Sequence, residues 1–217
     1  MTTVEEVTLW VHIAAGFLAL GAGAGAFATK KGGQRHRRFG RTFVYAMAVV
    51  SATAVALYPL RPNLLRLFLV LVAVFSFYFA FSGYRVLSRK RPDDDPARVD
   101  WAALGLLGLS GVGLVAIGVW LLVRGAGFGP VLLVFGAIAL AFTVTDVRSF
   151  RGDPERGAWV GQHVVRMGAA YIATVSAFSA VNFVFLPTVA RWLWPTLLGT
   201  PLLVYAVRRY ERRFAPG

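Results

Sequence analysis

LLRLFLVLVAVFSFYFAFSGY, residues 64–84, contains a single charged residue, Arg66. After Arg66 the chain is uncharged and mostly apolar for about 18 positions, the length at which a helix can cross the hydrocarbon core of a bilayer. A helix on the surface of a soluble protein would instead place polar residues at every third or fourth position. This stretch therefore predicts a transmembrane helix.

Similar apolar blocks lie on both sides of it. The chain has 217 residues, of which 57% are hydrophobic and only 15% are charged, and its mean hydropathy is +0.63. A soluble domain carries about 25% charged residues. We therefore expect an all-α fold, a bundle of seven transmembrane helices that forms a single integral membrane domain over residues 1–217. The expected spans are residues 7–28, 39–60, 64–84, 101–123, 125–145, 158–186 and 192–207.

The basic residues predict the orientation. Of the 23 lysines and arginines, 19 fall in alternate connections and the C-terminal tail, and 4 fall in the remaining connections. Cytoplasmic loops hold the excess of Lys and Arg, so the N-terminus is expected outside and the C-terminus in the cytoplasm of a cell-membrane protein. The net charge of +13 then indicates contact with anionic lipid headgroups and not with nucleic acid.

Two patterns of small residues predict close helix packing. Ala15, Ala19 and Gly23 recur at four-residue spacing, and Gly111 and Gly118 lie two turns apart. Small side chains at such intervals let two helices approach closely. The sequence leaves open whether such faces also pair two copies of the chain in a homo-oligomer.

Two prolines fall inside the last expected span, Pro195 and Pro201. They are expected to interrupt its helix, and broken helices line the substrate sites of some transporters. Prolines in membrane helices are more commonly tolerated as kinks. The pattern therefore gives only modest support to transport.

The sequence lacks several common catalytic motifs. With no cysteine, thiolate metal sites, iron–sulfur clusters and a cysteine nucleophile are excluded. It also has no HExxH, no GxSxG and no glycine-rich phosphate loop. Candidate chemistry therefore rests on the few polar residues inside the apolar blocks, which are costly there and are functional candidates by default.

His12 is the first of these residues. It lies near the outer end of its span, on the helix face that also holds Ala15 and Ala19. We expect it to point into the bundle. It is then either a buried histidine bonded to a neighbour, such as Asn182 or Thr196, or a haem ligand, a metal ligand or a proton relay.

A second group of polar residues is expected at the cytoplasmic end. His163 and Arg166 are three residues apart and share a helix face, Asp146 ends the preceding span, and His36 directly precedes the span 39–60. The simplest interpretation is a structural ion pair between Asp146 and Arg166 with His36 in a basic loop, because an unpaired arginine at that depth would be costly.

A functional interpretation of this group leaves three chemistries open. A haem b held by His36 and His163 would make a membrane redox protein, which is our leading hypothesis. A zinc ion held by His36, His163 and Asp146 would make a membrane hydrolase. A pocket of arginine and histidine side chains without metal, in which Arg166 beside Asp146 binds an anion, would make a non-enzymatic carrier or a lipid- or anion-binding protein.

Several segments together resemble a family of prokaryotic integral membrane proteins known only as a domain of unknown function. They are HIAAGFLALGAG (12–23), HRRFGRTFVYAM (36–47), SGYRVL (82–87), TDVR (145–148), QHVVRMGAAYIATVSAF (162–178) and WPTLLGTPLLVY (194–205). The resemblance extends over nearly the whole chain and implies a multi-span membrane protein. It implies no activity, substrate or cofactor, but it favours His12, His36, Asp146, His163 and Arg166 over the other polar residues.

Overall fold

The computed structural model describes residues 2–91, 93–152 and 157–214, and within them every regular element is helical. Seven α-helices and one short 3-10 turn follow one another along the chain, as the all-α prediction required. They are α1 (Thr3–Ala28), α2 (Gln34–Leu57), α3 (Leu64–Arg85), η1 (Val86–Ser88), α4 (Arg98–Val123), α5 (Gly129–Arg151), α6 (Ala158–Asn182) and α7 (Thr188–Phe214).

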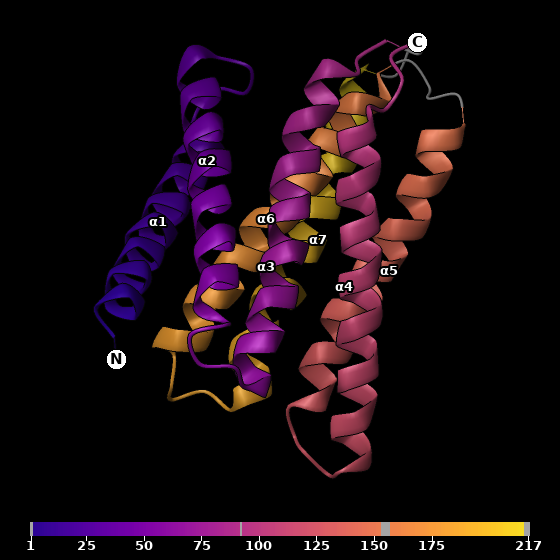
Figure 1. The fold of residues 1–217 in the computed structure, drawn as a ribbon. Helices are drawn as coiled ribbons and strands as arrows, with labels where there is room; N and C mark the ends of the chain where they lie inside the picture. Colours follow the sequence, from indigo (N-terminus) through magenta and orange to yellow (C-terminus); the bar gives the residue numbers. More distant parts are fainter. Residues whose placement is uncertain (1, 92, 153–156, 215–217) are drawn as a thin grey trace.

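The helices form two groups that share α3 and α6. The first group is a four-helix unit in which α1 packs on α2, α2 on α3, α3 on α6 and α6 on α1. The second adds α4, α5 and α7, with α4 on α3, α5 on α4 and α7 on α6 and α5. The α1–α2 hairpin and the α4–α5 hairpin therefore lie on opposite sides of α3, α6 and α7 (Figure 1).

An aromatic cluster of the core lies between α3, the start of α5 and α7. Phe68 of α3 is 1% exposed, and its ring contacts Phe128, Phe135 and Trp192 edge to face. Edge-to-face pairs add stability beyond the area that they bury. This cluster fixes α7, through Trp192, against the centre of the bundle.

The outside of the bundle is apolar. Leu109 and Val181 are 71% and 74% exposed, whereas a soluble protein covers such large apolar surfaces with polar side chains. Six helices, α1 to α6, are long and apolar enough to cross a membrane. Helix α7 is not among them, because its start carries Arg191 and two prolines dilute its apolar residues. Its crossing of the bilayer stays a prediction.

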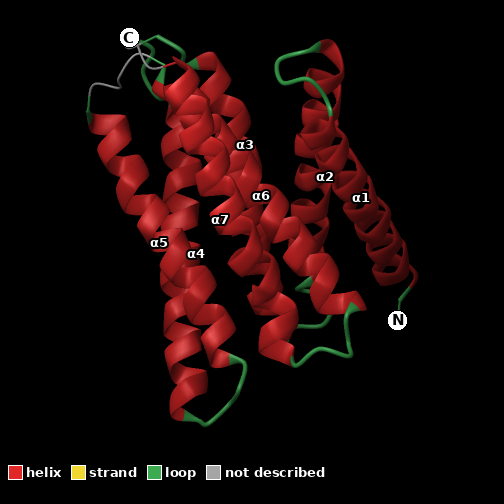
Figure 2. Cartoon of the chain, turned by 180° about the vertical axis from the view of Figure 1, so that it is seen from behind, coloured by secondary structure: helices red, strands yellow, loops and turns green. Residues whose placement is uncertain are grey.

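Connections of different charge lie at opposite ends of the bundle. The α1–α2 and α3–α4 connections and the C-terminal end of α7 lie together, and we call this the basic end (Figure 2). The N-terminus and the α2–α3, α4–α5 and α6–α7 connections lie at the opposite end. This separation agrees with the alternating charge in the sequence. Arg156, one of the basic residues counted there, lies outside the described residues.

Each of the seven helices differs from its expected span by at least one residue at one end, and three differences bear on the site or on an expectation. Helix α2 begins at Gln34, so His36 belongs to its first turn and not to a loop. Helix α5 continues to Arg151, which places Asp146 inside the helix. Helix α7 runs through Pro195 and Pro201 without a break, so the expected interruption was wrong. The prolines are accommodated within the helix, as in many membrane helices.

Helices α4 and α5 approach each other through glycines. A Cβ built on Gly118 would lie 3.2 Å from Gly129 O and 2.9 Å from Leu133 Cδ2, and one on Gly111 would lie 3.0 Å from Ala139 Cβ. Both glycines are buried. These contacts confirm the close packing predicted from the spacing of Gly111 and Gly118, because no larger side chain fits between the two backbones.

Replacing Gly118 with leucine is expected to destabilise the α4–α5 contact by about 1–3 kcal/mol, since the new side chain would meet backbone that cannot move aside. The measurement is the free energy of unfolding in mixed micelles. Gly105→Leu is the matched control on the same helix, because a Cβ there would meet nothing within 4 Å. Equal losses in the two variants would contradict the explanation.

Candidate functional site

The structure brings His36 and His163 together at the basic end. His36 extends from the first turn of α2 and His163 from the second turn of α6, and these helices lie diagonally across the four-helix unit. The two imidazole rings have centroids 6.4 Å apart and planes inclined by 77°. Both side chains are half-buried. Two residues that are far apart in the sequence therefore form one pair.

Each histidine of this pair is held by a backbone carbonyl at the end of a neighbouring helix. His36 Nδ1 donates to Ala26 O at 3.0 Å, and His163 Nδ1 donates to Gly83 O at 2.7 Å. These carbonyls are available because the last turn of a helix leaves them without an intrahelical partner. A carbonyl only accepts, so Nδ1 carries the proton and the lone pair of the neutral ring lies on Nε2.

Both Nε2 atoms are therefore available to a ligand. Within the described part of the chain neither of them takes part in a hydrogen bond. An Nδ1–H bond to a carbonyl is also the arrangement that orients histidines bound to metals, because it fixes both the tautomer and the ring. The pair has the donor atoms and the support of a two-histidine site.

Close contact between α3 and α6 positions His163. A Cβ on Gly83 would lie 2.9 Å from Met167 Sδ and 3.1 Å from Arg166 Cβ. Only glycine lets α6 pass this close to the end of α3, which is what brings His163 within reach of the Gly83 carbonyl.

A lysine shares the carbonyl that holds His36. Lys31 Nζ donates to Ala26 O and Phe27 O, at 3.1 and 2.7 Å, and so caps the C-terminus of α1. Partial burial lowers the pKa of Lys31 below its ordinary value. The last carbonyls of α1 thus accept hydrogen bonds from the side chains of Lys31 and His36, which follow α1 in the sequence.

His12 is separated from this pair. It lies 14 residues before Ala26 on α1, which corresponds to about 20 Å along a helix. Its Nδ1 donates to Val50 O at 3.1 Å and lies 2.9 Å from Thr53 Oγ1, both on α2. Its bonding partners are therefore not the expected Asn182 and Thr196. His12 joins α1 to α2 in the opposite half of the bundle.

Asp146 and Arg166 contact each other between α5 and α6. Arg166 Nη2 lies 2.5 Å from Asp146 Oδ1, and both residues are buried, at 3% and 4% exposed. Tyr78 of α3 donates to Asp146 Oδ2, and Arg166 Nη1 donates to Gln162 Oε1 at 3.2 Å. The buried carboxylate is thus bonded through both oxygens, which links three helices.

The residues of the expected zinc site are divided between two places. His36 and His163 are adjacent, but the oxygens of Asp146 are both bonded to Arg166 and Tyr78. In the described ranges no group of three His, Cys, Asp or Glu side chains is placed to hold a metal ion. A catalytic zinc usually has three protein ligands, and this arrangement supplies two imidazoles.

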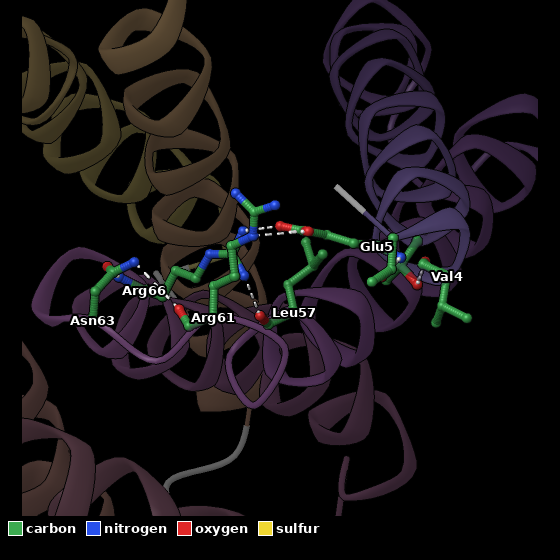
Figure 3. Close-up of polar contacts among 8 residues, drawn as sticks. Val4, Glu5, Leu57, Arg61, Asn63 and Arg66 are labelled. Atoms are coloured by element: carbon green, nitrogen blue, oxygen red, sulfur yellow. Dashed lines mark hydrogen bonds and ion pairs between the residues drawn. The ribbon is translucent and has the colours of Figure 1, made fainter.

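Two further charge clusters were not predicted as sites. At the opposite end Glu5, whose side chain is 2% exposed, bonds to Arg66 at 2.5 Å and Arg61 at 3.1 Å and so ties the start of α1 to α3 (Figure 3). At the basic end Asp100 pairs with Arg85. Their only signal in the sequence is a charge at the edge of an apolar block, which is also typical of solvated residues.

Comparison with known proteins shows that part of the chain is similar to one described family. Residues 9–102 match the family described as predicted membrane protein (DUF2306). This confirms the resemblance expected from the sequence, over α1, α2, α3 and the start of α4. His12 and His36 lie within the match, and Asp146, His163 and Arg166 lie beyond it. No curated protein and no solved structure matches the chain. Over these residues the chain is thus similar to membrane proteins whose family description assigns no activity.

Proposed function

We propose that this protein is a membrane electron-transfer protein that holds haem b between His36 and His163. One observation carries the proposal: two histidines from diagonal helices lie with ring centroids 6.4 Å apart, both Nδ1 atoms bonded to carbonyls and both Nε2 atoms available. Facing histidines in a helical bundle are a common means of holding haem.

The spacing of the two imidazoles fits this ligand. The ring centroids are 6.4 Å apart, a separation at which His36 and His163 would both reach one haem iron. The ring planes are inclined by 77°, so the imidazoles do not stack on each other. Without a ligand the two rings meet edge to face, as Phe68 and Phe135 do.

The surroundings supply positive charge for a flat anionic group. The ribbons of the α1–α2 hairpin and of α3 lie farther apart toward the basic end (Figures 1 and 2). Gly40 lies one turn from His36 on the same face of α2, and a Cβ there would meet nothing within 4 Å. The exposed residues Arg35, Arg37 and Arg38 lie in the same two turns and are suited to pair with the carboxylates of a haem.

A haem held by two histidines supplies one-electron transfer. The role of the chain is to fix the two Nε2 atoms through Ala26 O and Gly83 O and to place them at the end of an apolar bundle. Zinc hydrolysis has less support, since Asp146 is committed to Arg166 and Tyr78.

The experiment is an absorption spectrum of protein purified in detergent from cells supplied with a haem precursor, with haem quantified against protein. A Soret band at close to one haem per chain, with the split visible bands of a six-coordinate low-spin iron after reduction, is the expected result. Colourless protein that also fails to take up added haemin would refute the proposal.

We also propose that the basic end faces the cytoplasm of the cell membrane and that α7 crosses the bilayer. The charge separation between the two ends supports this orientation. The chain has no native cysteine, so single cysteines report on it directly. Gly127→Cys, in the exposed α4–α5 connection, is expected to react with a membrane-impermeant maleimide on intact spheroplasts.

The matched variant at the basic end is Asp95→Cys, which is also exposed. It is expected to react only after the membrane is permeabilised. The reverse pattern would place the basic end outside, and labelling of both sites on intact spheroplasts would contradict the crossing of α4.

A further inference from the structure

Two guanidinium nitrogens of Arg89, at the basic end, have no hydrogen-bond partner among the described residues. Arg89 follows η1, and its Nε and Nη2 are covered from solvent yet make no hydrogen bond within the ranges that the structure describes. Its Cζ lies 4.7 Å from the centre of the Phe150 ring. Burial, the largest effect on this group, lowers the pKa of Arg89 below its ordinary value. A partly desolvated charge of this kind is costly without a counter-ion.

The nearby carboxylates are already bonded to other arginines. Asp100 accepts two hydrogen bonds from Arg85, both at 3.0 Å, and a third from the Ala97 backbone. Asp146 is bonded to Arg166. Arg85 and Arg166 both repel the charge of Arg89, whereas Asp100 attracts it. Three arginines thus share two carboxylates, and Arg89 is the arginine that neither carboxylate contacts.

The pairing of these arginines with carboxylates makes Arg89, and not Arg166, the residue to which an anion would bind. The sequence pointed to Arg166, but the hydrogen bonds of Arg166 go to Asp146 and Gln162, and its side chain is 3% exposed. Arg89 is half-buried and is therefore less covered than Arg166. An incoming anion would therefore meet Arg89 and not Arg166.

A second cation lies beside Arg89. Lys90 is exposed, and its Nζ lies 5.0 Å from the centre of the Trp159 ring at the start of α6. Tryptophans at the ends of membrane helices lie at the level of the lipid headgroups. Two adjacent cations, each set over an aromatic ring, thus lie where phosphates of the bilayer surface are found.

We propose that Arg89, assisted by Lys90, binds the phosphate group of an anionic ligand at the basic end, either a phospholipid headgroup or a free phosphate. Guanidinium groups bind phosphate through paired, charge-assisted hydrogen bonds. The phosphate would be the counter-ion of Arg89, since the two nearby carboxylates are paired with other arginines.

The test compares Arg89→Gln with Arg91→Gln in detergent-purified protein. Arg91 is an exposed arginine of the same connection, so this control removes the same charge nearby. Three probes are titrated separately: phosphatidylglycerol, phosphatidylcholine and inorganic phosphate. The readouts are the shift in thermal midpoint and the number of retained lipids by native mass spectrometry.

Phosphatidylglycerol is expected to raise the midpoint of the wild type and of Arg91→Gln, and to bind Arg89→Gln about tenfold more weakly. Arg89→Lys should recover part of the response. Without any probe Arg89→Gln should be at least as stable as the wild type, because it removes an uncompensated charge, so misfolding would not imitate the result.

The remaining outcomes identify the source or overturn the site. A response to inorganic phosphate that Arg89→Gln also weakens assigns a free phosphate, whereas a response to phosphatidylglycerol alone assigns a lipid. Equal binding by wild type and Arg89→Gln overturns the proposal, and so does an equal loss in Arg91→Gln. A matching response to zwitterionic phosphatidylcholine would show that the net negative charge of the ligand does not matter and would overturn it as well.

Discussion

Asp146→Asn is expected to lower the free energy of unfolding by about 3–5 kcal/mol. The carboxylate is 4% exposed and bonds to Arg166 and Tyr78 at once. Replacing it with an amide leaves the guanidinium of Arg166, only 3% exposed, buried without its counter-charge. The loss is large because water cannot reach the orphaned charge, as it does at a surface ion pair.

The loss is measured by unfolding in mixed micelles. Asp95→Asn, the same substitution at an exposed position, is the control and should change little. The double variant Asp146→Leu, Arg166→Met removes both charges and should recover much of the loss, because a buried pair replaced by apolar side chains is often neutral. A loss below about 1 kcal/mol in Asp146→Asn would show that the contact is not a structural ion pair.

His36→Ala and His163→Ala are each expected to remove bound haem, leaving less than about a tenth of the wild-type Soret absorbance per chain. Each substitution deletes one of the two imidazoles whose centroids lie 6.4 Å apart. The measurement is the haem-to-protein ratio of purified variants, recorded together with their thermal midpoints.

His12→Ala is the matched control, since His12 also donates Nδ1 to a carbonyl, that of Val50, but lies far from the pair. It should keep its haem. His163→Met replaces one ligand with another that haem accepts and should retain a Soret band with shifted visible bands. A purely structural role for His163 would leave the spectrum unmoved. Equal loss in His12→Ala would show that haem retention reports only on folding.

The expected and observed fold agree where the signal is local. Residues 64–84 were expected to form one helix and correspond to α3, Leu64–Arg85, because a long apolar block satisfies its own backbone only as a helix in a bilayer. The ends were less predictable. Helix α2 begins five residues before the expected start at Phe39, since charged first turns at the membrane surface are helical without being apolar.

The sequence indicated which residues are candidates for the site but not which of them contact one another. His36, His163, Asp146 and Arg166 stood out because polar residues are rare in membrane spans. Their pairing depends on which helices face each other. Asp146 was weighed both as a zinc ligand and as an ion-pair partner, and its two bonded oxygens follow from the approach of α3 and α6. Arg89 carries no signal of its own in the sequence, since in a basic loop an arginine without a partner has the same context as any other arginine.

The sequence alone determined that this chain is a helical membrane protein with its basic residues gathered at alternate connections, because hydropathy and charge are properties of each segment and the bilayer acts on each segment separately. Only the tertiary structure decided that His36 meets His163 and that the end of α1 and the end of α3 fix their tautomers. It also decided that Arg89, among the described residues, lacks the carboxylate that Arg85 and Arg166 have. These are contacts between helices, and the order of helices around a bundle is set by the joint packing of all their faces, which no single segment encodes.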